Sequence, residues 1–202
     1  MSDQSVDSGK RTWLIASGCA GVVGGVAAAV PFVSSFQPSE RARAAGAAVE
    51  ADISDLKPGE KMTVEWRGKP VWIVRRTPEQ LETLKKTESL VADPKSERKP
   101  AEVTPMESTR NEWRSIKPEI LVVVGICSHL GCSPIERFVA GPQPSLPADW
   151  QGGFLCPCHG STFDMAGRVF KNVPAPDNLE VPPYTFLSDS KLLIGEDKNN
   201  KA

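Results

Sequence analysis

The residues that could bind a soft metal ion are concentrated in two short segments of the chain. Both histidines and four of the five cysteines lie in residues 127–132 (CSHLGC) and residues 156–161 (CPCHGS). Each segment offers one Cys/His pair at short spacing: Cys127 with His129, and Cys156 with His159. Two thiolates and two imidazoles suit either a zinc ion or an iron–sulfur cluster. We therefore expect a metal centre to which both segments contribute.

Zinc is the simplest alternative, because Cys-x-His and Cys-x-x-His arms can together form a closed Cys₂His₂ site. Zinc gives no reason, however, for the additional cysteine in each segment, Cys132 and Cys158. Two structural disulfides would account for four cysteines but would leave both histidines beside them by coincidence. The second cysteine pair, together with Gly131, Pro157 and Gly160, therefore favours an iron–sulfur site.

The two segments resemble the cluster-binding boxes of the Rieske family, in whose [2Fe–2S] centres two histidines replace two cysteines on one iron. The chain as a whole is similar to the Rieske subunits of bacterial quinol–cytochrome c oxidoreductase (respiratory complex III). The resemblance implies four ligands to one [2Fe–2S] cluster, with the cysteines on one iron and the histidines on the other: Cys127, Cys156, His129 and His159. It also implies a disulfide that joins the two loops: Cys132–Cys158.

Imidazole ligands matter because they make the cluster less negative than four thiolates would, so that it accepts an electron more readily. Potentials rise from roughly −400 mV to between about −150 and +300 mV, and a centre at the upper end can oxidise a quinol. Reduction adds negative charge and so favours a protonated imidazole, which lets a histidine accept a proton with the electron. By resemblance, His159 is the better candidate to receive the quinol hydrogen bond, and His129 also faces solvent.

Two nearby side chains, Ser161 and Phe163, are expected to tune the centre. Ser161 matches the family serine whose hydroxyl points at a bridging sulfide, while a simple turn residue is the alternative. Phe163 stands where high-potential members have a tyrosine bonded to a ligand cysteine sulfur. This predicts a lower potential, consistent with a lower-potential quinone such as menaquinone or with a modest loss of driving force. Ser128 replaces a common threonine, and this exchange is expected to be neutral.

Two further features lie close to the boxes. Residues 173–176 (VPAP) match a proline loop that shields the cluster, but Val173 occupies its usual glycine position, where backbone freedom matters. Leu130 is expected either to offer apolar docking surface to a cytochrome b subunit or simply to pack within its loop.

The N-terminal segment predicts a membrane anchor over residues 12–33. These 22 residues carry no charge, which is enough to span a hydrocarbon core of roughly 30 Å at about 1.5 Å per residue. Lys10 and Arg11 precede the segment and favour a cytoplasmic N-terminus over residues 1–11. The pair also resembles a twin-arginine export signal, and a cleaved signal peptide is the alternative to an uncleaved anchor.

The remainder of the chain is predicted to be a flexible tether over residues 34–50 and a mainly antiparallel β domain over residues 51–202. A helical continuation of the anchor is the alternative for the tether. A short inserted helix is expected to begin at Thr77, which can form a capping box with Gln80. Strands or hairpins are expected at the following residues: 62–66 with 71–74, 120–126, 154–155, 162–170, 179–181, 184–187 and 191–194.

The interpretation of the whole chain is an iron–sulfur subunit of a quinol–cytochrome c reductase, active only within its complex. The resemblance implies a cytochrome b subunit, a c-type cytochrome, quinol and the lipid bilayer as partners, within a dimeric complex. The location would be the bacterial inner membrane with the cluster domain in the periplasm, where a disulfide can persist. A net charge of −1 does not indicate nucleic-acid binding. Alternatives are the Rieske subunit of an arsenite oxidase, and a Rieske ferredoxin or dioxygenase component.

Overall fold

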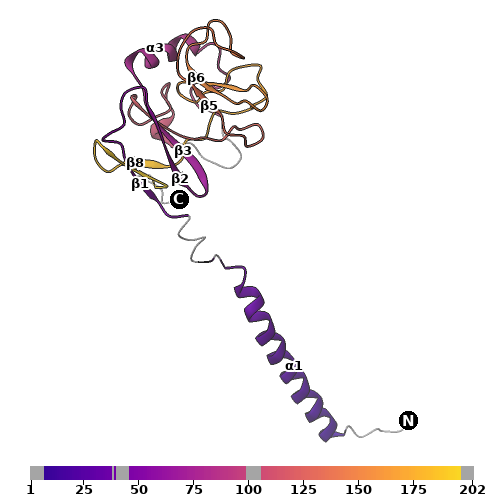
Figure 1. Cartoon of the computed structure of the whole chain (residues 1–202). Helices are drawn as coiled ribbons and strands as arrows, with labels where there is room; N and C mark the ends of the chain where they lie inside the picture. The colour runs from indigo at the N-terminus through magenta and orange to yellow at the C-terminus, as the bar shows by residue number, and fades with distance from the viewer. Residues whose placement is uncertain (1–6, 38, 40–45, 99–105, 197–202) are drawn as a thin grey trace. The chain divides into compact units, whose positions relative to one another are not determined.

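The computed structural model describes residues 7–37, 39, 46–98 and 106–196, so residue 38 and residues 40–45 of the expected tether lie outside the described residues. The chain divides into two units, residues 1–44 and residues 45–202. Each unit is described by itself below (Figure 1).

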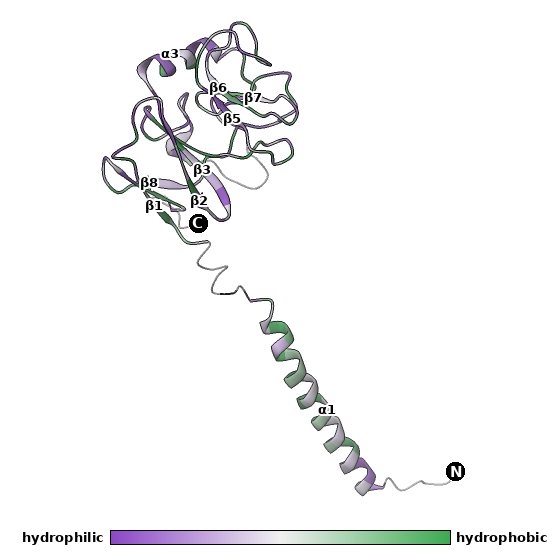
Figure 2. Ribbon diagram, viewed as in Figure 1, coloured by the Kyte–Doolittle hydropathy of each residue, from purple (hydrophilic) through white to green (hydrophobic). Residues whose placement is uncertain are grey.

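The first unit contains a single long helix among its described residues, α1 (Ser8–Ser34). Asp7 caps its start, because the carboxylate accepts hydrogen bonds from the backbone nitrogens of Gly9 and Lys10. The helix is long and apolar enough to cross a membrane. Figure 2 shows that the start of the helix is hydrophilic and that the turns after it are mostly apolar. The residues expected to form the anchor, 12–33, lie within this helix.

The second unit is built mainly from antiparallel strands, as expected. Its described strands form three sheets of three strands each. The base sheet consists of β2 (Lys61–Trp66), β3 (Lys69–Arg75) and β4 (Ile120–Val124). The loop sheet consists of β5 (Ile135–Arg137), β6 (Gly153–Leu155) and β7 (Thr162–Asp164). The terminal sheet consists of β1 (Val49–Asp52), β8 (Tyr184–Phe186) and β9 (Lys191–Ile194).

The base sheet forms as the sequence predicted. Arg67 and Gly68 both adopt left-handed φ angles, 53° and 70°, which suits the tight turn of a two-residue hairpin between β2 and β3. β3 then pairs with β4 on its other side, and every residue of β4 is buried. The β-branched run of β4 therefore forms the buried strand that leads toward Cys127.

A capping box begins the inserted helix α3 (Pro78–Thr87), as expected. The Thr77 side chain accepts from the backbone nitrogen of Gln80 at 3.2 Å, and the Gln80 side chain accepts from that of Thr77 at 2.9 Å. A short 3₁₀ turn, η1 (Glu107–Thr109), follows later in the chain.

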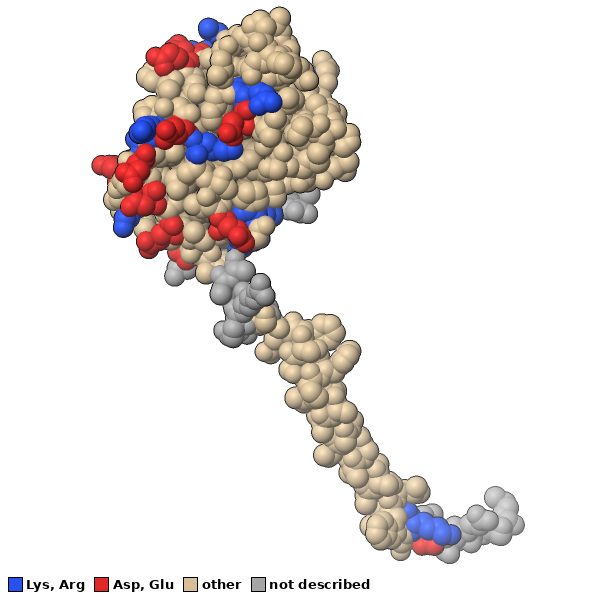
Figure 3. Space-filling view, in the orientation of Figure 1, with Lys and Arg blue, Asp and Glu red and all other residues tan. Residues whose placement is uncertain are grey.

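Charged side chains of both signs are distributed over the visible face of this unit (Figure 3).

Two expectations about the strands need correction. The predicted strand at residues 179–181 does not form, although these residues are described. Leu179 donates its backbone hydrogen bond to Gly167 and Glu180 accepts one from Val124, so the segment bonds two different partners and builds no ladder. Its apolar alternation reflects burial in the core. β5 was not predicted, because its residues are only partly buried.

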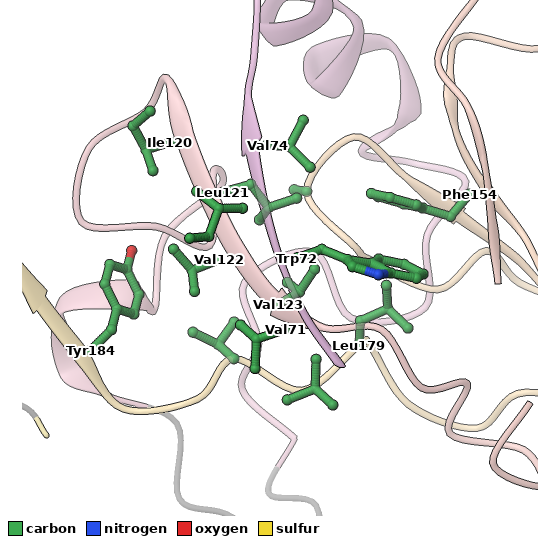
Figure 4. Close-up of a cluster of buried hydrophobic side chains, with 14 of the residues drawn as sticks. Val71, Trp72, Val74, Ile120, Leu121, Val122, Val123, Phe154, Leu179 and Tyr184 are labelled. Atoms are coloured by element: carbon green, nitrogen blue, oxygen red, sulfur yellow. The ribbon is translucent and has the colours of Figure 1, made fainter. Parts of the chain in front are cut away.

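The core lies between the base sheet and the segments that follow it. Buried side chains from β3, β4 and β6 meet there with Leu179 and Tyr184 (Figure 4). The hairpin predicted over residues 162–170 forms in this region and turns at residues 166–167, because Asp164 donates its backbone hydrogen bond to the Arg168 carbonyl and Gly167 donates to the Asp164 carbonyl. The second box therefore leads directly into a buried hairpin.

Candidate metal centre

The first loop, residues 127–132, closes on itself directly after β4. The Cys127 backbone nitrogen donates to the Cys132 carbonyl at 2.8 Å, and Gly131 donates to the Cys127 carbonyl at 3.1 Å. Gly131 has a φ of 81°, which a residue with a side chain rarely adopts. The local hydrogen bonds thus fix a compact loop at the end of a buried strand.

The second loop, residues 156–161, repeats the same backbone pattern after β6. Cys156 donates to the Ser161 carbonyl at 2.7 Å, and Gly160 donates to the Cys156 carbonyl at 3.0 Å. Gly160, with a φ of 76°, occupies the position equivalent to Gly131. The two boxes are therefore structurally similar loops, each beginning at a cysteine that a strand delivers.

The four expected ligands lie at two depths. Cys127 and Cys156 are free thiols, each only 2% exposed. His129 is partly buried and His159 is exposed, and their rings lie edge to face with centroids 4.8 Å apart. The structure thus brings two buried sulfur donors and two outward imidazole donors from separate loops into one site.

The expected disulfide between the loops is confirmed, because Cys132 and Cys158 are bonded. The sulfur atoms of these two residues and of Cys156 all lie within 4.8 Å of one another. Disulfide sulfurs are not thiolate ligands, so Cys156 is the one of these three that offers a free metal donor. The disulfide therefore lies directly beside the ligand positions and joins the two loops.

The thiols fit a bound iron centre. Burial raises the pKa of the Cys127 thiol, while a hydrogen bond from the His129 backbone lowers it. The neighbouring Cys156 thiol also raises this pKa, and the Ser161 hydroxyl lowers it. Two adjacent buried thiolates need a positively charged partner, which a metal provides as it displaces their protons. The donor set of two cysteines and two histidines suits a [2Fe–2S] cluster of the Rieske type.

Two serine hydroxyls attach the loops to the proline-rich segment, residues 173–177. Ser161 Oγ accepts from the Ala175 backbone nitrogen at 3.0 Å. Ser128 Oγ donates to the Asp177 carbonyl at 2.6 Å and accepts from its nitrogen at 3.3 Å. Each loop is therefore attached to the proline-rich segment by one serine. This role of Ser128 could not be predicted from its small polar side chain alone.

The valine in the proline-rich segment needs no unusual backbone conformation. The left-handed φ of 61° falls on Asn172 and not on Val173. Asparagine tolerates this region better than a β-branched residue does. The substitution at the usual glycine position is thus accommodated by the preceding residue.

Replacing Phe163 by tyrosine should raise the midpoint potential of the bound cluster. Phe163 is fully buried in the hydrophobic cluster that also contains Cys127 and Cys156. A hydroxyl that donates to a cysteine sulfur stabilises the reduced, more negative state. A preference of about 1 kcal/mol for that state corresponds to roughly 40 mV for one electron. Redox titration followed by electron paramagnetic resonance (EPR) measures this shift.

Phe170→Tyr is the matched control for this measurement. Phe170 is only partly buried and packs against Trp150 with ring centroids 5.6 Å apart. The same added hydroxyl should leave the potential unchanged there. An unchanged potential in Phe163→Tyr would contradict the expectation that the missing hydroxyl lowers the potential of this centre.

Comparisons with known proteins define the class to which this site belongs. A family model described as the Rieske [2Fe-2S] domain matches residues 85–184. A second model, described as the TAT signal of the ubiquinol–cytochrome c reductase Fe-S subunit, matches residues 3–39. The second unit, hereafter the compact unit (residues 45–202), is thus a Rieske iron–sulfur domain. The interpretation of the N-terminal segment as a twin-arginine export signal is supported.

Curated relatives identify the family more closely. The chain is 53% identical to the ubiquinol-cytochrome c reductase iron-sulfur subunit of Allochromatium vinosum, over 99% of this chain and 95% of the relative. It is 40% identical to the subunit of the same name from Bradyrhizobium diazoefficiens, over 90% of each chain. The chain therefore belongs to the family of Rieske iron–sulfur subunits of ubiquinol–cytochrome c reductase, and the predicted [2Fe–2S] cofactor is confirmed.

A solved structure titled "Hyperthermophilic respiratory Complex III" is also similar to this chain. The two sequences are 28% identical over 88% of this chain and 97% of that one, with a TM-score of 0.44.

Proposed function

We propose that this chain is the electron-transfer subunit of a bacterial quinol–cytochrome c oxidoreductase. The observation that carries the proposal is the pair of matching loops, which place two buried free thiols and two outward imidazoles beside one disulfide. Near full-length similarity to ubiquinol-cytochrome c reductase subunits supports it. The same similarity favours this function over the arsenite oxidase alternative.

Four residues would hold the cofactor in this proposal: Cys127, Cys156, His129 and His159. When bound, the [2Fe–2S] cluster supplies one-electron chemistry at a potential within reach of quinol oxidation. The buried cysteines keep the sulfur side of the site away from water. The backbone nitrogen of His129 and the hydroxyl of Ser161 hydrogen-bond to the Cys127 sulfur, and such contacts set the potential of a metal site.

His159 is the side chain that meets the quinol in this proposal. It is the exposed member of the imidazole pair, so a ring nitrogen can accept a hydrogen bond from a quinol hydroxyl and then hold its proton. Leu130 follows His129 and is 70% exposed. An exposed leucine beside the imidazoles supplies apolar surface that a cytochrome b subunit would cover when the site is occupied.

The proposed topology follows from the N-terminal segment. Residues 1–11 would lie in the cytoplasm, residues 12–33 would span the inner membrane once, and the expected tether, residues 34–50, would hold the cluster domain in the periplasm. The last two residues of this tether already belong to β1 of the domain. The apolar helix α1 and the match to an export-signal model support this arrangement. The tether would let the domain deliver the electron to a c-type cytochrome within a dimeric complex.

EPR of the dithionite-reduced full chain tests the ligand set and the cofactor together. We expect one [2Fe–2S] signal per chain, with nitrogen couplings from two imidazoles in pulsed spectra. Adding quinol to the assembled complex should reduce this centre, and a c-type cytochrome should reoxidise it. A silent spectrum with stoichiometric zinc would overturn the proposal, and a signal with no nitrogen coupling would overturn the ligand set.

A further inference from the structure

One indole ring of the base sheet contacts the supports of both cluster-binding loops. Trp72 lies in β3, the middle strand of the base sheet, and is 4% exposed. Its ring faces Gly125, two residues before Cys127 in the first loop. It also faces Phe154, two residues before Cys156 in the second loop. No local sequence pattern indicates this role, because Trp72 is far from both loops along the chain.

The contact with Gly125 is close enough to require a glycine. A Cβ placed on Gly125 would lie 2.2 Å from Trp72 Cε2 and 2.5 Å from Cζ2. Gly125 has no left-handed φ angle that would explain the glycine by itself. Its backbone nitrogen also donates to the Pro70 carbonyl at 2.8 Å. The indole therefore lies against the bare backbone from which the first loop begins.

The contact with Phe154 is an aromatic stack. The two ring centroids lie 5.3 Å apart with an interplanar angle of 16°, and Figure 4 shows the rings side by side. Phe154 is fully buried in β6, the strand that leads into the second loop, and it pairs with Phe163 of β7, the strand that follows this loop. Such pairs have a preferred geometry beyond simple area burial. The indole thereby fixes where the second loop begins.

A charged contact completes the junction between the two sheets. Lys61 of β2 places its amine 4.6 Å from the centroid of the Trp72 ring. The same amine forms an ion pair with Glu136 of β5. The indole thus contacts β2, β6 and the start of the first loop, at the place where the base sheet meets the loop sheet.

We propose that Trp72 is a positioning residue for the cluster, because its ring sets the spacing between the supports of the two ligand-bearing loops. The disulfide joins the loops beside the ligands, while Trp72 joins them at their bases. This inference rests on the proposed ligand set. Moving either support would change the distances from backbone donors to the ligand sulfurs, and so the electronic environment of the cluster.

Trp72→Leu in the full chain, purified with its cluster, tests the inference. We expect broader EPR lines of the reduced cluster, a lower midpoint potential and loss of the cluster in urea about tenfold faster. Trp72→Phe keeps an aromatic ring against Phe154 and should restore most of the spectrum. Gly125→Ala disturbs the same contact from its other partner, because the added methyl group pushes against the Trp72 ring, and it should also broaden the signal. This variant keeps the inference testable if Trp72→Leu fails to fold.

Trp66→Leu is the matched control. Trp66 is also 4% exposed, and its Nε1 would lie 2.5 Å from a Cβ placed on Gly195, the residue that follows β9. This variant should lose stability while its EPR spectrum and potential stay as in the wild type. Equal spectral changes in both tryptophan variants, or none in Trp72→Leu and Gly125→Ala, would overturn the inference. A wild-type chain without the cluster signal would instead remove the proposed function.

Discussion

Replacing Asp164 by asparagine should lower the free energy of unfolding of the compact unit by about 3–5 kcal/mol. Asp164 and Arg168 are both fully buried, and Arg168 Nε donates to Asp164 Oδ2 at 2.7 Å. The other carboxylate oxygen accepts from the backbone nitrogens of Ala166 and Arg168, each at 2.9 Å. Thr87 at the end of α3 donates its hydroxyl to Oδ2 at 3.1 Å. Removing the charge would therefore leave a buried guanidinium without its partner.

Two further arginines make this loss more costly. Arg76 donates to the Met165 carbonyl at 3.1 Å and Arg114 donates to the Ala166 carbonyl at 3.0 Å, so both surround the same hairpin. Burial lowers the pKa of each to about 10, and both therefore remain charged at neutral pH. Both carboxylate oxygens of Asp164 accept hydrogen bonds, whereas the NH₂ group of an asparagine donates. The amide would therefore place two donors opposite each other. Asp164 is thus the buried negative charge on which this positively charged hairpin depends.

Urea titration of the full chain in detergent, followed by far-ultraviolet circular dichroism, measures the change. Glu82→Gln is the control, because Glu82 also pairs with a basic residue, Lys85, but both side chains are largely exposed. That variant should change the unfolding midpoint little, since exposed ion pairs contribute little. Similar midpoints in Asp164→Asn and Glu82→Gln would mean that the buried pair does not stabilise the hairpin.

The parts of this fold that could be predicted from sequence are those set by neighbours along the chain. The hairpin of β2 and β3 follows from alternation around a glycine turn, and α3 follows from its capping box. The two loops could be recognised because each places its donors and its left-handed glycine within six consecutive residues. Such local patterns need no knowledge of the tertiary structure.

The parts that could not be predicted depend on partners distant in sequence. Arg114 lies in residues 93–118, a charged and proline-rich stretch whose composition predicts exposure to solvent, yet its side chain is buried against carbonyls of residues 166, 167 and 179. Its charge alone predicts exposure, and only the fold supplies the carbonyls that satisfy it. Trp72 is similar, because no local feature indicates which loops its ring will contact. The prediction of a strand at residues 179–181 was wrong for the same reason. Alternating apolar residues indicate burial, but they do not show which strand would pair with the segment.

Replacing both disulfide cysteines by serine should destabilise the compact unit by about 3.5 kcal/mol, the loop-closure value for a bridge of this span. Cys132 and Cys158 are 26 residues apart in the sequence, so the bond restricts a long segment of the unfolded chain. In the folded chain it joins two loops, each of which is also attached to the proline-rich segment by one serine contact. We therefore also expect the cluster to be lost much faster in a chelator than in the wild type.

The double variant is the informative one because of the geometry around Cys156. A single replacement would leave a free thiol within 4.8 Å of Cys156, where a new thiolate could compete for iron. Serine at both positions removes the bond without adding a ligand. Cys158 is exposed and Cys132 partly exposed, so dithiothreitol acting on the wild type should reach the bond and reproduce the faster loss of the cluster.

Cys19→Ser is the control for both measurements, because Cys19 is a free cysteine in α1 and takes no part in the bridge. It should leave the unfolding midpoint and the lifetime of the cluster unchanged. If the double serine variant instead kept its cluster as long as the wild type while unfolding at lower urea, the bond would stabilise the fold without holding the loops. The contacts of Trp72 at the bases of the loops, and of the serines with residues 173–177, would then suffice to retain the ligands. Loss of both properties together would show that the loops need the covalent bond beside the ligands as well as the packing at their bases.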